Sequence, residues 1–147
     1  MLALVTQLFG LATPAVADPI TESRRLYVSL NAYRAALMDL LALKAVEPRV
    51  TADLIEKYVY TPANVSGSVW IDRSFSEGQE SYRPFSGCLN AAMALSDLSS
   101  RIILSPSGSD LTIVGAAAYL REVLTGCEVA LDHSQRAPQM DSRSNSD

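Results

Sequence analysis

Three carboxylates between residues 72 and 80 are the side chains best suited to acid–base chemistry. Asp72, Glu77 and Glu80 lie close together in the sequence, with aromatic residues interleaved among them. A pair of carboxyl groups beside aromatic rings is what a glycoside hydrolase uses. Acidic residues in a polar stretch are more commonly solvated, and Asp72 with Arg73, or Glu80 with Arg83, can form surface ion pairs. A small carboxylate-dependent hydrolase is therefore one hypothesis, and it requires the three carboxylates to converge in a cleft.

Other catalytic chemistries lack the residues they need. The single histidine, His133, falls in a polar C-terminal segment that we expect to be disordered, where nothing would hold it in catalytic geometry. A zinc site needs several His or Cys ligands, and the two cysteines have a different use, given below. The sequence contains no nucleophile elbow, phosphate-binding loop or dinucleotide fingerprint. We therefore predict a protein that is not an enzyme and that holds no cofactor or metal.

Residues 61–86 favour binding instead. This stretch is rich in Ser, Gly, Asn and Pro, which predicts a long loop, with a short strand around the only tryptophan as an option. Aromatic and arginine side chains supply contact area in protein interfaces. The alternative is that the rings fold back and complete the core. The candidate contact residues for a protein partner are Trp70, Arg73, Phe75, Tyr82, Arg83 and Phe85.

Residues 88 to 127 predict the hairpin that must hold this loop. Apolar residues recur there at alternating steps of three and four, the spacing of a packed helix face. In an antiparallel pair the opposed positions have numbers that add to 215, from Cys88 with Cys127 to Ile102 with Ile113. The turn then falls at residues 105–110, where Pro, Gly and Ser cluster. Because both cysteines lie on the packed face and opposite one another, we predict a Cys88–Cys127 disulfide.

The remaining segments predict a small all-α antiparallel bundle of three long helices and one short helix. Asp18 and Pro19 are a typical start for a first long helix, over residues 19–44. Thr51 begins a short helix that Pro62 ends, and the two helices of the hairpin run to about residues 104 and 131. The bundle domain therefore spans residues 18–131, and the polar residues 132–147 form a disordered tail.

The first 17 residues have the outline of a secretory signal peptide. An apolar run is broken by Pro14 and followed by Ala15-Val16-Ala17, a small-x-small triplet. The run is shorter than the roughly 20 apolar residues that span a bilayer, so we expect no stable membrane insertion after cleavage. The alternative is an ordinary buried helix. Export to the periplasm or the exterior agrees with a disulfide. The alternatives for the two cysteines are two free thiols in the core or a redox-active pair.

Composition limits the range of partners. A chain of 147 residues makes one domain, and its net charge of −4 argues against nucleic acid and anionic membrane surfaces. We therefore predict an extracytoplasmic binding protein of the inhibitor or immunity type, which acts on a protein partner through the 61–86 loop. The alternative from another class is an accessory structural subunit of an envelope assembly. That subunit requires an uncovered apolar stripe on the first or last helix.

The hairpin also resembles one known family. Cys88 opens one helix, and Ala118-Tyr119-Leu120 precedes Leu124-Thr125-Gly126-Cys127 at the end of the next. This pattern is similar to the second half of the plant invertase and pectin methylesterase inhibitors, which are secreted four-helix bundles with a bridge across this hairpin. The resemblance covers about 45 residues and consists mainly of spacing. The chain lacks that family's N-terminal cysteine pair, and the resemblance assigns no site residue.

Overall fold

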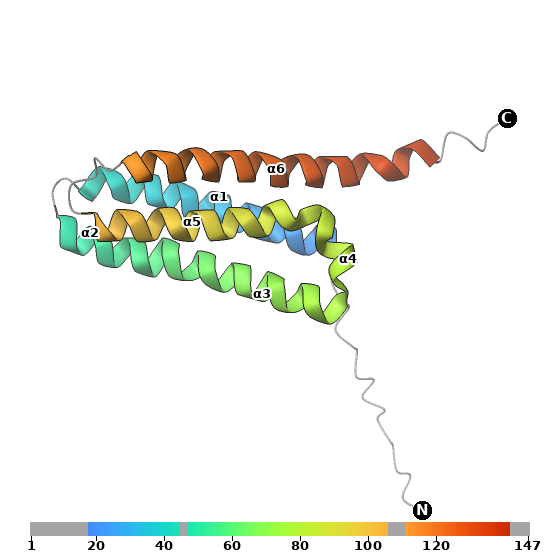
Figure 1. The fold of residues 1–147 in the computed structure, drawn as a ribbon, viewed down its shortest axis with the longest axis horizontal. Coiled ribbons are helices and arrows are strands. Elements are labelled where there is room, and N and C mark those ends of the chain that lie inside the picture. Colours follow the sequence, from blue (N-terminus) through green and yellow to red (C-terminus); the bar gives the residue numbers. More distant parts are fainter. Residues whose placement is uncertain (1–17, 45–46, 106–110, 142–147) are drawn as a thin grey trace, which may run out of the picture.

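The protein is an all-α antiparallel bundle, as the sequence predicts. The computed structural model describes residues 18–44, 47–105 and 111–141, which contain no strand. Four long helical segments lie side by side (Figure 1). In chain order the elements are α1 (Pro19–Lys44), α2 (Pro48–Ile55), the π-helical turn η1 (Glu56–Tyr60), α3 (Thr61–Glu77), α4 (Gln79–Tyr82), the 3-10 turn η2 (Arg83–Phe85), α5 (Ser86–Leu104) and α6 (Leu111–Asp141).

Helix α1 begins where the sequence predicts. The Asp18 carboxylate accepts hydrogen bonds from the Thr21 backbone N–H, at 3.0 Å, and from the Thr21 hydroxyl, at 2.7 Å. These bonds satisfy free donors at the helix start and stabilise the ionised carboxylate. They lower the pKa of Asp18 below its usual value, the Thr21 hydroxyl having the largest effect. Further along α1, Leu26, Leu30 and Leu37 are buried in the core.

The second long helical segment occupies most of the stretch where the sequence predicts a loop, so that prediction is wrong. Helices α2 and α3 are joined through η1, so helical structure continues from Pro48 to Glu77, and the expected loop and strand are replaced by helix. Its buried face recurs every three or four residues, as in other packed helices, but most of its members are small or polar. The buried residues are Thr51, Ile55, Val59, Ala63, Gly67, Trp70 and Ser74.

Small residues on this face let α3 approach α5 closely. A Cβ atom added at Gly67 would lie 3.3 Å from the Cβ of Ala92 on α5. The hydroxyl of Ser74 donates to the Ile71 carbonyl at 2.7 Å, so its burial leaves no donor without a partner. The small and polar residues that predict a loop in the sequence are therefore the ones that let these two helices pack closely.

Proline 62 fits within the helix because the backbone widens before it. Proline has no N–H for the carbonyl four residues earlier, and its ring collides with that carbonyl in an ideal helix. Here η1 replaces the ordinary turn, and the Thr61 N–H bonds to the Glu56 carbonyl, five residues back. A π-turn of this kind accommodates one extra residue within a helix. The helix therefore passes Pro62 without ending.

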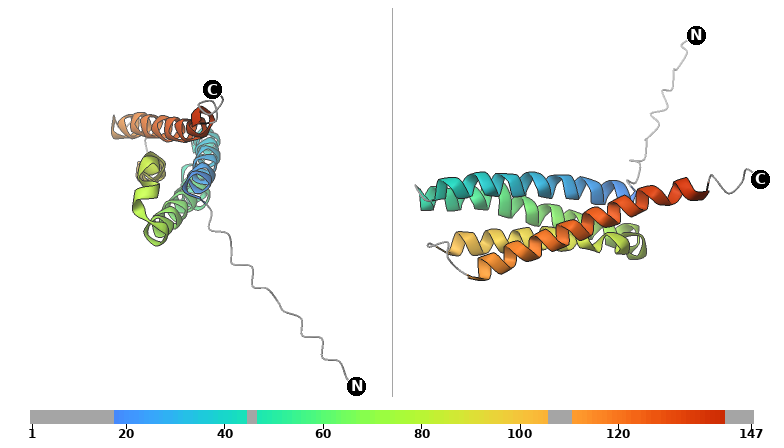
Figure 2. Two further views of the ribbon diagram at one scale, coloured as in Figure 1. Left: turned by 90° about the vertical axis from the view of Figure 1, so that its right-hand side faces the viewer. Right: turned by 90° about the horizontal axis from the view of Figure 1, so that it is seen from above.

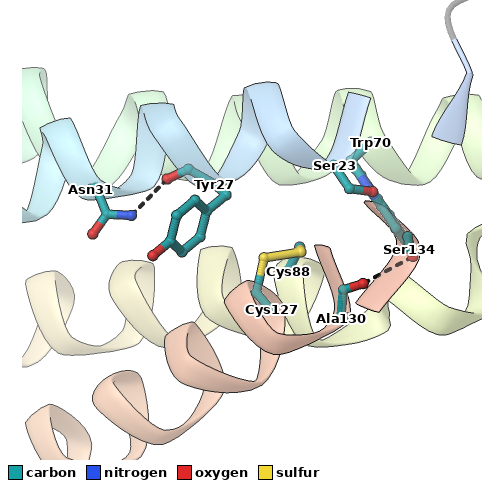
Figure 3. Close-up of a disulfide and its surroundings, with 8 residues drawn as sticks. All are labelled: Ser23, Tyr27, Asn31, Trp70, Cys88, Cys127, Ala130 and Ser134. Carbon is teal, nitrogen blue, oxygen red and sulfur yellow. Dashed lines mark hydrogen bonds between the residues drawn. A yellow bond between two sulfur atoms is a disulfide. The ribbon is translucent and has the colours of Figure 1, made fainter. Parts of the chain in front are cut away.

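The α5–α6 hairpin and its disulfide confirm the prediction. Cys88 and Cys127 are bonded, with their Cα atoms 4.6 Å apart, and both are fully buried. The bridge lies between the two helices, and Tyr27 of α1 lies beside it (Figure 3). Gly87 permits this close approach, since a Cβ added there would lie 3.3 Å from the backbone nitrogen of Cys127. Within the described part of the chain, α5 and α6 form the most extensive helix pair.

Helix α6 is longer than predicted. It crosses the bundle obliquely, from beside α5 at its start to beside the beginning of α1 at its end (Figure 2). It continues to Asp141, so the prediction of a disordered tail is wrong for residues 132–141. Leu131 is buried, and the Gln135 amide, with its oxygen turned toward α1, accepts from both Nη atoms of Arg24 at 2.8 and 2.7 Å. Contact with α1 accounts for the extension; residues 142–147 lie outside the described part.

The predicted signal peptide, residues 1–17, also lies outside the described residues. Among the helices that the structure describes, none is both long enough and apolar enough to cross a membrane.

Candidate functional site

Four of the six predicted contact residues meet at one corner of the bundle. Gly78, with a φ of 107°, ends α3 and turns the chain into α4. A backbone of this left-handed kind is open to glycine at little cost. The end of α3, helix α4 and the start of α5 enclose a shallow cleft of about 440 Å³. Its lining residues are Trp70, Ile71, Ser74, Phe75, Gln79, Glu80, Tyr82, Arg83 and Leu89.

The floor of this cleft is part of the core. Trp70 is 6% exposed, and Tyr82 and Phe85 are also buried. The rings of Trp70 and Tyr82 pack edge to face, with centroids 5.2 Å apart and planes at 86°. The Trp70 Nε1–H donates to the Ser23 hydroxyl on α1 at 3.0 Å. These three rings therefore pack inward, and the prediction that they form an exposed contact surface is corrected by their burial.

The rim of the cleft is exposed. Phe75 is 69% exposed, an unusual position for a large apolar ring. Beside it, the Arg83 and Glu80 side chains are exposed and form an ion pair at 3.6 Å. Of the predicted contact residues, Phe75 and Arg83 are thus free to contact a partner. We call Phe75, Glu80 and Arg83 the corner rim.

A charged network behind the rim ties α1 to α3. The Glu22 carboxylate, whose side chain is 8% exposed, lies 2.8 Å from Arg25 and 3.4 Å from Arg73. Arg73 also lies 3.7 Å from Glu77, which accepts a hydrogen bond from the Tyr82 hydroxyl. Arg73, a predicted contact residue, therefore joins carboxylates on two helices.

This network perturbs one titratable group strongly. Burial of the hydroxyl, followed by the hydrogen bond to Glu77 and its charge, raises the pKa of Tyr82 to about 12. The phenol therefore stays protonated and continues to donate to Glu77. Sequence reasoning missed Glu22 and Ser23, which belong to α1. The only sign of these two polar residues in the sequence is their position on a face of the first helix that is otherwise apolar.

The carboxylates of the hydrolase hypothesis do not converge. Glu77 is engaged with Tyr82 and Arg73, Glu80 is exposed on the rim, and Asp72 is exposed on α3 outside the cleft. Within residues 18–44, 47–105 and 111–141, no group of three or more His, Cys, Asp or Glu side chains is placed to hold a metal ion. The three carboxylates therefore do not form a pair of opposed acids in the cleft.

A second feature of the described residues is a surface with a mainly apolar lining. It is a groove of about 310 Å³ between α1, α5 and the first half of α6. The parts of α1, α5 and α6 that line it lie toward the end of the bundle opposite the α3–α4 corner (Figure 1). The two features are therefore separate surfaces.

Comparison of the chain with known protein families, with characterised proteins and with solved structures found no match. The spacing resemblance of the hairpin to plant invertase inhibitors therefore assigns no role to any residue.

Proposed function

We propose that this chain is an exported binding protein, of the inhibitor or immunity type, that contacts a protein partner through the α3–α4 corner. One observation carries the proposal: Phe75 is 69% exposed at the edge of an apolar-floored cleft, beside the charged side chains of Glu80 and Arg83. Aromatic and arginine anchors beside a cleft are typical of binding hot spots.

The buried residues serve this surface indirectly. Trp70 and Tyr82 are held by each other, by Ser23 and by Glu77, so α3 and α4 meet in a fixed geometry. A surface that is ordered before binding loses less conformational entropy when its partner arrives. Two of the rings predicted as contacts, Trp70 and Tyr82, thus become the support for Phe75.

Export is supported by the disulfide. Disulfides persist mainly in oxidising compartments, and Cys88–Cys127 is a buried structural bridge. A periplasmic or secreted location follows from this proposal, with the apolar N-terminal segment as the signal for export.

The test is a pull-down from the native extracytoplasmic fraction. We would compare wild type with a Phe75→Ala, Arg83→Ala variant, and with a Tyr58→Ala, Arg49→Ala variant that removes an exposed aromatic and an exposed arginine far along the same helical segment. All three should share one melting temperature. We expect a partner that wild type and the control retain and the corner variant loses, with affinity reduced tenfold or more. A partner retained equally by all three would place the contact elsewhere.

A further inference from the structure

The groove between α1, α5 and α6 exists because α6 diverges from α1. The second half of α6 lies beside the beginning of α1, whereas its first half lies over α5 (Figure 2). Ala117, a small residue of that first half, lines the groove and leaves the space between α6 and α1 unfilled. The groove is therefore built by helix geometry and by sequence together.

The lining has a simple chemistry. Side chains from three helices supply an apolar wall, and the remaining two lining residues are Arg34 on α1 and Arg121 on α6. Among the residues that the structure describes, no carboxylate, hydroxyl or amide side chain lines the groove. The apolar residues that define its floor and sides include Leu37, Leu41, Leu98, Ile102, Ala117 and Leu120.

The two guanidinium groups give the groove a positive charge. Both arginines are exposed, and no carboxylate of the described residues lies within salt-bridge distance of either. Guanidinium groups bind carboxylate and phosphate through paired, charge-assisted hydrogen bonds. An apolar trough flanked by two such cations complements a molecule with an aliphatic chain and an anionic head group.

We infer that this groove binds a single-chain amphiphilic anion, of the class of long-chain carboxylates, with its chain against the apolar wall and its head group at Arg34 and Arg121. The volume agrees, since small-molecule pockets begin near 300 Å³, are mainly apolar and carry a few polar groups that fix orientation. Met38, at 63% exposure, lies at the opening, where an aliphatic chain would cover it.

Another kind of occupant fits less well. A second copy of this chain seated on the same face would bring its own arginines to a surface that has no lining carboxylate to receive them. The inference concerns a surface separate from the α3–α4 corner, so either proposal can fail alone.

The test uses the full, disulfide-bonded chain and two probes of equal length, dodecanoate and dodecyltrimethylammonium, below their micelle concentrations. Calorimetric titration should show one dodecanoate site and at least tenfold weaker binding of the cationic probe. An Arg34→Gln, Arg121→Gln variant should lose that preference. A chain that binds neither probe, or both equally, would overturn the inference.

A groove-filling variant locates the site. Ala117→Leu places a larger side chain in the groove, and Ala118→Leu makes the same change at the adjacent, exposed position outside it. We expect Ala117→Leu to weaken dodecanoate binding tenfold or more and Ala118→Leu to leave it unchanged. Equal binding by both variants would contradict the assignment. Concentration-dependent dimerisation of wild type that Ala117→Leu abolishes would replace it with a second copy as occupant.

Discussion

The indole nitrogen of Trp70 lies 3.0 Å from the hydroxyl oxygen of Ser23, and this bond joins α3 to α1 in the interior of the bundle. Ser23 is fully buried and Trp70 nearly so. A tryptophan can be buried at low cost only if its N–H has a partner. This pairing explains why the single tryptophan of the chain belongs to the core, although its surroundings in the sequence are typical of a loop.

The pairing predicts non-additive effects on stability. Trp70→Phe leaves the Ser23 hydroxyl without its donor, and Ser23→Ala leaves the indole N–H without its acceptor. Each should lower the free energy of unfolding by about 1–3 kcal/mol, since a buried polar group loses its partner. The double variant should lose less than the two single changes combined. Denaturant unfolding of all four proteins measures this, and strict additivity would show that the bond has no energetic role.

The disulfide predicts a large loss on reduction. Cys88 and Cys127 are 39 positions apart, and closing a loop of this size stabilises a fold by about 4 kcal/mol on the chain-entropy estimate. Cys88→Ala with Cys127→Ala should lower the free energy of unfolding by about that amount, measured with guanidinium. Peptide mapping without reductant should find the two cysteines joined. Two titratable thiols in the unreduced, denatured protein would contradict the pairing.

Two helical glycines, Gly67 on α3 and Gly115 on α6, should respond in opposite ways to a larger side chain. At Gly67 a larger side chain meets Ala92, so Gly67→Leu should destabilise the fold by about 1–3 kcal/mol through overpacking. A Cβ at Gly115 meets nothing within 4 Å, so Gly115→Ala should stabilise it by about 0.5–1 kcal/mol through helix propensity. Thermal melting of both variants tests this. A neutral Gly67→Leu change would mean that the two helices can separate freely.

The raised pKa of Tyr82 predicts a pH dependence at the alkaline end. Folding raises the pKa from about 10 in an unfolded chain to about 12, so the folded state holds this proton more tightly. The resulting stabilisation is complete below pH 10 and is lost as the pH rises toward 12. Wild type should therefore lose stability more steeply than Tyr82→Phe over this range. The exposed Tyr119→Phe variant is the control and should follow wild type.

The hairpin was predictable because large apolar residues and two cysteines mark its packed face. Cys88, Leu95 and Ile102 on one helix, and Leu120 and Leu124 on the other, are buried as their spacing predicts. The register follows from pairing the apolar positions of the two helices, and the disulfide confirms the pairing of Cys88 with Cys127.

Helix α3 was not predictable by the same reasoning, because its packed face is made of small residues. Ala63, Gly67 and Ser74 have helical spacing, but none is a large apolar residue, and Gly and Ser are typical of turns. Pro62 reinforced the error, since the π-turn that accommodates it leaves no mark in the composition. The site residues were predicted poorly for the same reason. Whether a ring is buried depends on the face of the helix that carries it, and of the six predicted contact residues only Phe75 and Arg83 are exposed.

The π-turn at Glu56–Tyr60 gives this helix a place where its length can change. Elsewhere in a helix, deletion of one residue rotates everything beyond it by about 100° and turns the buried face to solvent. Within a π-turn, deletion of one residue instead restores ordinary helical winding and leaves both flanking faces in register. Ordinary winding would also press the Pro62 ring against the carbonyl four residues back. A single-residue deletion between residues 56 and 60 should therefore be tolerated in a Pro62→Ala background, and not at Gly67 or Trp70 in the same background. The π-turn therefore holds one extra residue in this helix while the turns on either side keep their packed faces in register.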